Sequence, residues 1–129
     1  LNWITGWVDW NIVLNESGGP NWANNFVDSP IIVNATADEF YKQPMFYIMG
    51  HFAKFLPRGS VRIGLESLST SEDEVLVGAF LNPDDEVVLQ VLNKNDVAVT
   101  VEISDDDAGM FQHRIPAASF TTLLWRTRK

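Results

Sequence analysis

The second half of the chain is a series of short runs in which apolar and polar residues alternate. The runs occupy residues 61–68, 75–81, 86–92, 97–103, 110–115 and 120–125. Alternation with a period of two places apolar side chains on one face of a β-strand. Turn-forming residues separate the runs at intervals of about ten residues, which is typical of an antiparallel sandwich or barrel. The sequence therefore predicts an all-β module over residues 59–129.

A different period precedes this module. After Pro44, apolar side chains recur at three- and four-residue spacing, at Met45, Ile48, Met49, Phe52, Phe55 and Leu56. Such a stripe is typical of an amphipathic helix, and Pro suits the first helical position. Pro57-Arg58-Gly59 should end the helix, whose apolar face should press against a sheet. We therefore predict an α/β region that ends at residue 58.

The α/β region opens on an almost continuous apolar run. Residues 1–14 predict a strand that is buried on both faces, as in a parallel sheet. Residues 15–30 are rich in Asn, Ser, Gly and Pro and predict a long loop. Because the loop contains Trp22, Phe26 and Val27, we expect it to be ordered and functional. A brief strand should follow at residues 31–33.

Trp residues are interleaved with Asn and Asp at the start of the chain. Four of the five Trp lie in the first 22 residues, and Trp7, Asp9 and Trp10 are close neighbours. A sugar ring stacks its C–H groups on an indole plane, and its hydroxyls bond carboxylate and amide groups. An indole N–H also needs a polar partner when it is buried. The pattern favours a sugar-binding site, with an aromatic-rich edge of the hydrophobic core as the alternative.

Composition narrows the function classes. The net charge of −8 argues against a nucleic-acid partner, because phosphate binding needs clustered Lys and Arg. The chain has no Cys, two His and no apolar run that could span a bilayer, so we expect no thiol chemistry, metal site, cofactor or transmembrane segment. It opens at Leu1 on residues that resemble a protein interior, so we expect a segment of a longer protein. The triplets at Asn15 and Asn34 fit N-glycosylation acceptors and favour the secretory pathway.

The opening region also contains carboxylates. A glycosidase needs two carboxyl groups beside the scissile bond, about 5–5.5 Å apart in a retaining enzyme. Asp9, Glu16 and Asp28 are the acidic residues near the Trp cluster. For Asp9, a hydrogen bond to an indole or backbone group is a more common role than catalysis. The residues therefore predict a sugar site without an assigned catalytic residue.

Several motifs resemble the glucosylceramidases, the acid β-glucosidases of glycoside hydrolase family 30. They are Gly6-Trp7-Val8-Asp9-Trp10-Asn11, Gly18-Gly19-Pro20-Asn21-Trp22, Asn25-Phe26-Val27-Asp28-Ser29-Pro30-Ile31-Ile32-Val33, Phe40-Tyr41-Lys42-Gln43-Pro44-Met45-Phe46-Tyr47 and the closing Leu123-Leu124-Trp125-Arg126. The resemblance implies that residues 1–58 are the C-terminal end of a (β/α)8 TIM barrel. Residues 1–11 would be its last strand, 44–57 its last helix, and 12–43 a small antiparallel β appendage with an entrance loop. Residues 59–129 would be a β-sandwich.

The same resemblance implies roles for individual residues. Trp10 would stack on the glucosyl group and Asn25 would bond its hydroxyls. Trp7 and Asp9 would shape the mouth of the site. The entrance loop would carry three further residues, Phe26, Val27 and Asn24, the last of which stands where the family often has a basic residue. The implied substrate is glucosylceramide, hydrolysed to glucose and ceramide in the lysosomal lumen after secretory transport, with a saposin-type activator and an anionic lipid surface as partners.

The resemblance also implies what the chain lacks. The family's catalytic Glu pair lies on earlier barrel strands, and none of the chain's Glu residues matches either position: Glu16, Glu39, Glu66, Glu72, Glu74, Glu86 and Glu102. We therefore expect the chain alone to be inactive. Because one strand and one helix cannot close a barrel, residues 1–57 should expose apolar surface. The alternatives are a non-catalytic carbohydrate-binding β-sandwich module, which a doubly buried opening strand disfavours, and a structural interaction domain.

Overall fold

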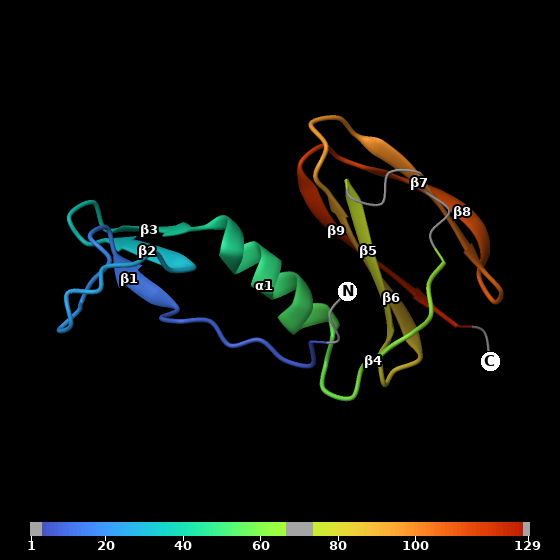
Figure 1. The fold of residues 1–129 in the computed structure, drawn as a ribbon, viewed down its shortest axis with the longest axis horizontal. Coiled ribbons are helices and arrows are strands. Elements are labelled where there is room, and N and C mark those ends of the chain that lie inside the picture. The colour runs from blue at the N-terminus through green and yellow to red at the C-terminus, as the bar shows by residue number, and fades with distance from the viewer. Residues whose placement is uncertain (1–3, 67–73, 128–129) are drawn as a thin grey trace. The chain divides into compact units, whose positions relative to one another are not determined.

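The computed structural model describes residues 4–66 and 74–127 (Figure 1). The chain divides into two compact units, Leu1–Phe52 and Ala53–Lys129, and each is described by itself. The elements are β1 (Val13–Asn15), β2 (Ile31–Asn34), β3 (Glu39–Lys42), α1 (Pro44–Phe55), β4 (Val61–Arg62), β5 (Val75–Leu81), β6 (Glu86–Asn93), β7 (Val99–Asp105), β8 (Gly109–Ile115) and β9 (Ser119–Arg126). Residues 1–3 of the predicted opening strand, residues 67–68 of the first alternating run and Glu72 lie outside the described residues.

The first unit contains a three-stranded sheet in the order β1-β2-β3 (Figure 1). The brief strand predicted at residues 31–33 is confirmed as β2, which pairs antiparallel with β3. The β1–β2 pair is parallel, so the prediction of an antiparallel appendage is wrong for this pair. Parallel neighbours need a crossover connection of about a dozen or more residues, and the long loop between β1 and β2 provides one.

The opening apolar run does not form the predicted doubly buried strand. Residues 4–12 have no regular secondary structure, and their large apolar side chains are exposed: Ile4, Trp7, Val8, Trp10 and Ile12. Only Leu14 in β1 is buried. A strand is buried on both faces only when strands flank its edges and other layers cover its faces, and the described residues do not supply these neighbours. The prediction that this region exposes apolar surface is confirmed.

The predicted helix is confirmed as α1, and it begins at Pro44 as expected. The helix ends at Phe55, two residues before the Pro57 that was expected to stop it. No residue of α1 is buried, and Tyr47, Ile48 and Phe52 are exposed. The expectation that α1 presses its apolar stripe against a sheet is therefore not met in this chain.

The second unit is an antiparallel β structure of two sheets (Figure 1). One sheet has the order β4-β5-β6-β9, and the other contains β7 and β8. Five of the predicted runs are confirmed as β5 to β9, with ends that differ by no more than two residues. In the described part of the run at 61–68, residues 61–66, Val61 and Arg62 are the residues that lie in a strand.

The core of the second unit is formed by both sheets. Its buried residues are Ala79 on β5, Leu89 and Val91 on β6, and Ile115 on β8. The register pairs Leu89 with Ala79 on one side and with Leu123 on the other. Side chains of β7 and β9 pack around this cluster, including Val101, Ile103 and Trp125. β7 alternates between partly buried and exposed residues, as predicted for a sandwich strand, whereas β6 is buried on both faces.

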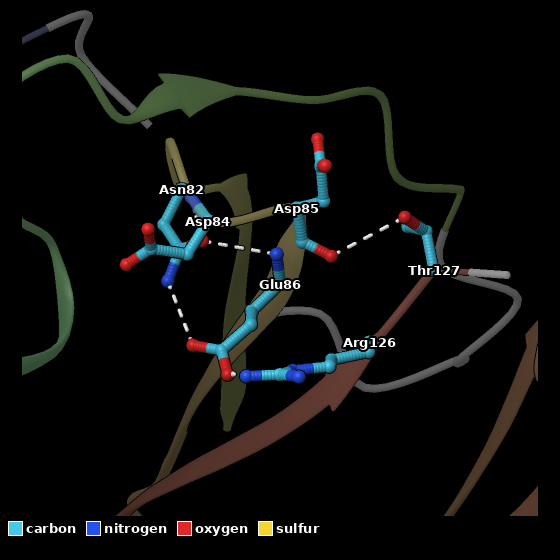
Figure 2. A network of polar contacts seen from close by, with 6 residues as sticks. All are labelled: Asn82, Asp84, Asp85, Glu86, Arg126 and Thr127. Atoms are coloured by element: carbon cyan, nitrogen blue, oxygen red, sulfur yellow. Dashed lines mark hydrogen bonds and ion pairs between the residues drawn. The ribbon is translucent and has the colours of Figure 1, made fainter. Parts of the chain in front are cut away.

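Buried Asn82 organises the turn between β5 and β6 (Figure 2). Its side-chain oxygen accepts the backbone N–H groups of Asp84 (3.0 Å) and Glu86 (2.9 Å), and its Nδ2 donates to the Glu86 carboxylate (3.0 Å). The carbonyl of Asp85 then accepts both the backbone N–H and the hydroxyl of Thr127, just after β9. The Asn82 side chain therefore provides hydrogen-bond partners for the backbone of the turn. The Asp85 carbonyl of the same turn holds Thr127, the residue after β9.

The two sheets of the second unit are linked by a polar contact at Asp105. The indole N–H of Trp125 on β9 donates to Asp105 Oδ2 on β7 (3.2 Å), and the Trp125 ring packs edge-on against Phe111. Asp105 Oδ1 accepts the backbone N–H groups of Ala108 (2.7 Å) and Asp107 (2.9 Å). The bond from Ala108, followed by those from Trp125 and Asp107, lowers the pKa of Asp105 despite partial burial.

Candidate functional site

The predicted sugar-stacking residues lie on the irregular segment before β1. The indoles of Trp7 and Trp10 are 71% and 70% exposed, so both offer free ring faces. Asp9 Oδ1 accepts the backbone N–H of Trp10 at 2.8 Å. Asp9 therefore makes the backbone hydrogen bond that the sequence suggested, and this bond orients the peptide that carries Trp10.

Asn15 closes the start of the loop that follows β1. Its side-chain oxygen accepts the N–H groups of Ser17 (3.0 Å) and Gly19 (2.8 Å), and its backbone N–H donates to the Gly19 carbonyl (2.7 Å). Gly18 is buried with φ of 78°, and a side chain there would meet the Val27 carbonyl at 2.6 Å. Only glycine fits this contact, which joins the start of the loop to its far side.

A second Asn shapes the middle of the loop around Asn25. The side-chain oxygen of Asn21 accepts the N–H groups of Ala23 (2.8 Å) and Asn25 (3.2 Å), and its Nδ2 donates to the Asn25 carbonyl. Asn24 adopts a positive φ of 55° within this turn, a conformation that Asn tolerates well. Sequence reasoning missed the role of Asn21, although Asn is a common turn builder through such side-chain bonds.

The loop ends in contacts that involve Asp28. Asp28 Oδ1 accepts the N–H of Ser29 (2.8 Å) and the side-chain amide of Gln43 (3.4 Å). Ser29 is buried, and its hydroxyl donates to the Ile31 carbonyl at 2.6 Å. These bonds give the Asp28 carboxylate a structural role at the end of the loop, just before β2.

The remaining loop residues present apolar surface. Trp22 is 98% exposed, and Phe26 and Val27 are also exposed. The structure places Trp7, Asp9 and Trp10 together on one segment, and Asn24, Asn25, Phe26 and Val27 together on the loop. The hydrogen bonds of Asp9 and of Asn25 are each made within their own segment.

A hollow of about 430 Å³ lies over the small sheet instead. It is lined by residues of β1, β2, β3 and the turn between β2 and β3: Val13, Ile31, Val33, Asn34, Ala35, Asp38, Glu39 and Phe40. None of the predicted sugar-contacting residues lines this hollow. Among the residues that the structure describes, no three His, Cys, Asp or Glu side chains gather as metal ligands, and no helix is both long and apolar enough to cross a membrane.

The chain matches two family models in succession. Residues 1–56 match the glycosyl hydrolase family 30 TIM-barrel domain, and residues 59–123 match the glycosyl hydrolase family 30 beta sandwich domain. Together they define a glycoside hydrolase segment in which the end of a TIM barrel is followed by a β-sandwich, as the sequence predicted. The chain belongs to glycoside hydrolase family 30.

Individual relatives agree with this assignment. The chain is 50% identical over 123 residues to mouse lysosomal acid glucosylceramidase, and 45% identical over 130 residues to putative glucosylceramidase 3 of Caenorhabditis elegans. These matches cover 95% and 98% of the chain but 24% of each relative, so the chain spans about a quarter of their length.

Solved structures share the fold. SrfJ of Salmonella typhimurium superposes with a TM-score of 0.82 at 31% identity, covering 93% of this chain and 26% of SrfJ. The endo-β1,6-glucanase BT3312 superposes with a TM-score of 0.80 at 22% identity, covering 92% of this chain and 26% of the glucanase. A TIM barrel closes with eight strands and eight helices, so the rest of such a barrel would cover apolar side chains such as Ile4, Val8 and those of α1, which are exposed here.

Proposed function

We propose that this chain forms one wall of the sugar site in a retaining β-glucosidase that hydrolyses glucosylceramide to glucose and ceramide. The observation that carries the proposal is the 50% identity to mouse lysosomal acid glucosylceramidase across 95% of the chain. The catalytic Glu pair is contributed from outside these 129 residues. Residues 1–58 serve as the C-terminal end of the catalytic barrel, and residues 59–129 as its β-sandwich.

Within this proposal, Trp10 is the stacking platform for glucose and Asn25 is a hydrogen-bonding partner of its hydroxyls. The exposed ring of Trp10 and its backbone bond to Asp9 support the first role, because an oriented and uncovered indole can receive a sugar face. The Asn21 side chain supports the second role, since it occupies the backbone groups of Asn25 and leaves the amide side chain for a ligand.

The neighbouring residues complete the proposed mouth of the site. Trp7 and Asp9 shape it, and Asn24, Phe26 and Val27 form an entrance loop. The exposure of Phe26 and Val27 supports a surface that meets the lipid part of the substrate, because apolar side chains gain from covering acyl chains.

We further propose that the protein works in the lysosomal lumen, which it reaches by the secretory pathway. The name of the mouse relative and the two glycosylation triplets support this location. An acidic chain also tolerates low pH well, because protonation reduces its self-repulsion. A saposin-type activator and an anionic lipid surface are the proposed partners.

The test is steady-state hydrolysis of a fluorogenic β-glucoside by the full-length protein at acidic pH. Trp10→Ala and Asn25→Ala should each reduce kcat/KM by about 10- to 100-fold, the effect of losing a contact worth about 1.5–3 kcal/mol. Phe40→Ala is the control, because Phe40 is another exposed aromatic residue, on β3, and it should retain activity. Unchanged kcat/KM for Trp10→Ala would remove Trp10 from the site. Binding of the glucoside without hydrolysis would favour the carbohydrate-binding module.

A further inference from the structure

We propose that Asn34 carries an N-linked glycan and that Asn15 does not, although both lie in acceptor triplets. The inference rests on the secretory route in the proposed function. It goes beyond that function because it assigns a covalent modification to one side chain and a purely structural role to the other.

Asn34 is half-buried and lies where the β2–β3 hairpin enters its turn. It is the last residue of β2, and it pairs with Glu39, the first residue of β3. Residues 35–38 form the turn between them, and every residue from 35 to 40 is exposed. The triplet Asn34-Ala35-Thr36 therefore sits where a transferase and a bulky glycan have free access.

The amide of Asn34 can accept the modification at little cost. Its side-chain oxygen accepts the N–H of Ala37 at 3.0 Å, and its Nδ2 donates to the Tyr41 hydroxyl at 3.4 Å, on the exposed surface. In the transfer, Nδ2 forms a bond to the anomeric carbon of a lipid-linked oligosaccharyl diphosphate. The bond from that carbon to the diphosphate oxygen breaks, and Nδ2 releases one proton. The second hydrogen stays on Nδ2, so both contacts of the amide survive.

Tyr41 offers a support for the first sugar. Its hydroxyl donates to Glu39 Oε2 at 2.8 Å, and this bond raises the pKa of Tyr41, so the phenol stays protonated. Its side chain is exposed, and its hydroxyl lies 3.4 Å from Asn34 Nδ2. A sugar attached to Asn34 can rest its C–H face on the Tyr41 ring. The glycan would also cover β3, an edge strand with four exposed residues, and exposed edges favour unwanted pairing between chains.

Asn15 is also exposed, but its side chain is tied into the backbone of its own loop. Its side-chain oxygen accepts two backbone N–H groups within this loop. Gly18 and Gly19 beside it are buried. Asn15 therefore builds the loop that leads to the entrance residues, and a glycan there would crowd the closed segment 15–19.

The experiment uses the full-length protein secreted from cultured animal cells. Enzymatic release of N-glycans in heavy-oxygen water labels each occupied Asn, and peptide mass spectrometry reads Asn15 and Asn34 separately. We expect label at Asn34 and none at Asn15. Absence of label at Asn34, or label at Asn15, would overturn the inference.

Two pairs of variants isolate the triplets without disturbing either Asn. Thr36→Ala should lose one glycan, seen as a single-step increase in gel mobility, whereas Thr36→Ser should keep it because the triplet remains valid. Ser17→Ala destroys the other triplet but keeps the backbone N–H that Asn15 binds, and it should leave the mobility unchanged. A shift in Ser17→Ala, or none in Thr36→Ala, would contradict the assignment.

Hydrolysis of the β-glucoside by the same preparations separates the two proposals. Activity without a glycan at Asn34 overturns this inference alone. The glycan without activity overturns the proposed function alone.

Discussion

Replacing Asp105 with Asn should loosen the sheet of β7 and β8 from the sheet that contains β9. The Asp105 carboxylate accepts three hydrogen bonds, from the indole of Trp125 on the facing sheet and from the backbone of Asp107 and Ala108 in its own turn. A sheet of two strands is marginally stable by itself, so β7 and β8 depend on the core and on this link. The substitution keeps the size of the side chain, removes its charge, and replaces one acceptor oxygen with an amide donor.

The expected loss is about 1–2 kcal/mol of local stability. An amide has one acceptor oxygen, so Asn cannot serve both the Trp125 indole and the backbone N–H groups of the turn. A hydrogen bond to a charged group contributes about 1.5–3 kcal/mol, and the partial exposure of Asp105 lets water replace some of it. Trp125→Phe should cost about 0.5–1.5 kcal/mol, because it removes the N–H but keeps a ring against Phe111.

The effect should depend on pH in a defined direction. The Ala108 N–H, with smaller help from Trp125 and Asp107, holds the pKa of Asp105 below its usual value. A carboxyl group with a depressed folded-state pKa contributes stability above its unfolded pKa of about 3.9 and loses that contribution as pH falls through the folded pKa. The difference between wild type and Asp105→Asn should therefore be constant from neutral pH to about pH 5 and should shrink below about pH 4.

Hydrogen–deuterium exchange of the full-length protein measures this directly. Peptides that cover β7 and β8 should exchange about 5- to 30-fold faster in Asp105→Asn, the ratio that corresponds to 1–2 kcal/mol. Asp106→Asn is the matched control, since it removes the same charge from an exposed residue of the same turn and should change exchange little. Equal exchange in the two variants, or an effect of Asp105→Asn that grows below pH 4, would refute the reasoning.

Three further predictions follow from packing, backbone geometry and the missing catalytic pair. Ile115→Ala should destabilise the sandwich by about 2–5 kcal/mol because Ile115 is fully buried, whereas exposed Met110→Ala should cost less than about 0.5 kcal/mol; urea unfolding compares them. Gly18→Ala should lower the thermal stability of the loop and the affinity for glucoside, because the new methyl group would meet Val27. Gly64→Ala has open space around it and should lower neither; equal behaviour of the two variants would contradict the contact. The 129-residue chain alone should not hydrolyse a fluorogenic β-glucoside, and measurable turnover that Asp9→Asn abolishes would show that it holds its own catalytic acid.

The predicted site divides into parts that the residues indicated and parts that needed the family resemblance. Interleaved Trp and Asp marked the segment around Trp10 as a sugar site, because stacking and hydrogen bonding need those residue types together. The choice of Asn25 came from the resemblance alone, since nothing local distinguishes it from Asn24. The bonds by which Asn21 holds Asn25 depend on a turn conformation that composition does not reveal.

The predicted opening strand failed for a physical reason. An apolar run such as residues 4–12 signals burial, but burial needs neighbouring strands and covering layers. The chain spans about a quarter of its curated relatives, and within the described residues this segment stays exposed. The apolar pattern thus indicated the burial that this segment would have in a complete barrel, and not its conformation in this chain.

By itself, the sequence determined where β5 to β9 lie to within two residues, and where α1 begins. Side-chain periodicity, Pro44 and the turn clusters act over a few residues, so β5 to β9 and α1 were readable without any partner. Only the tertiary structure decided which strands pair. The parallel β1–β2 contact, the place of β9 beside β6 and the bond from Trp125 to Asp105 join residues that are distant along the chain. Such pairings depend on chain closure and shared packing, which no local pattern encodes.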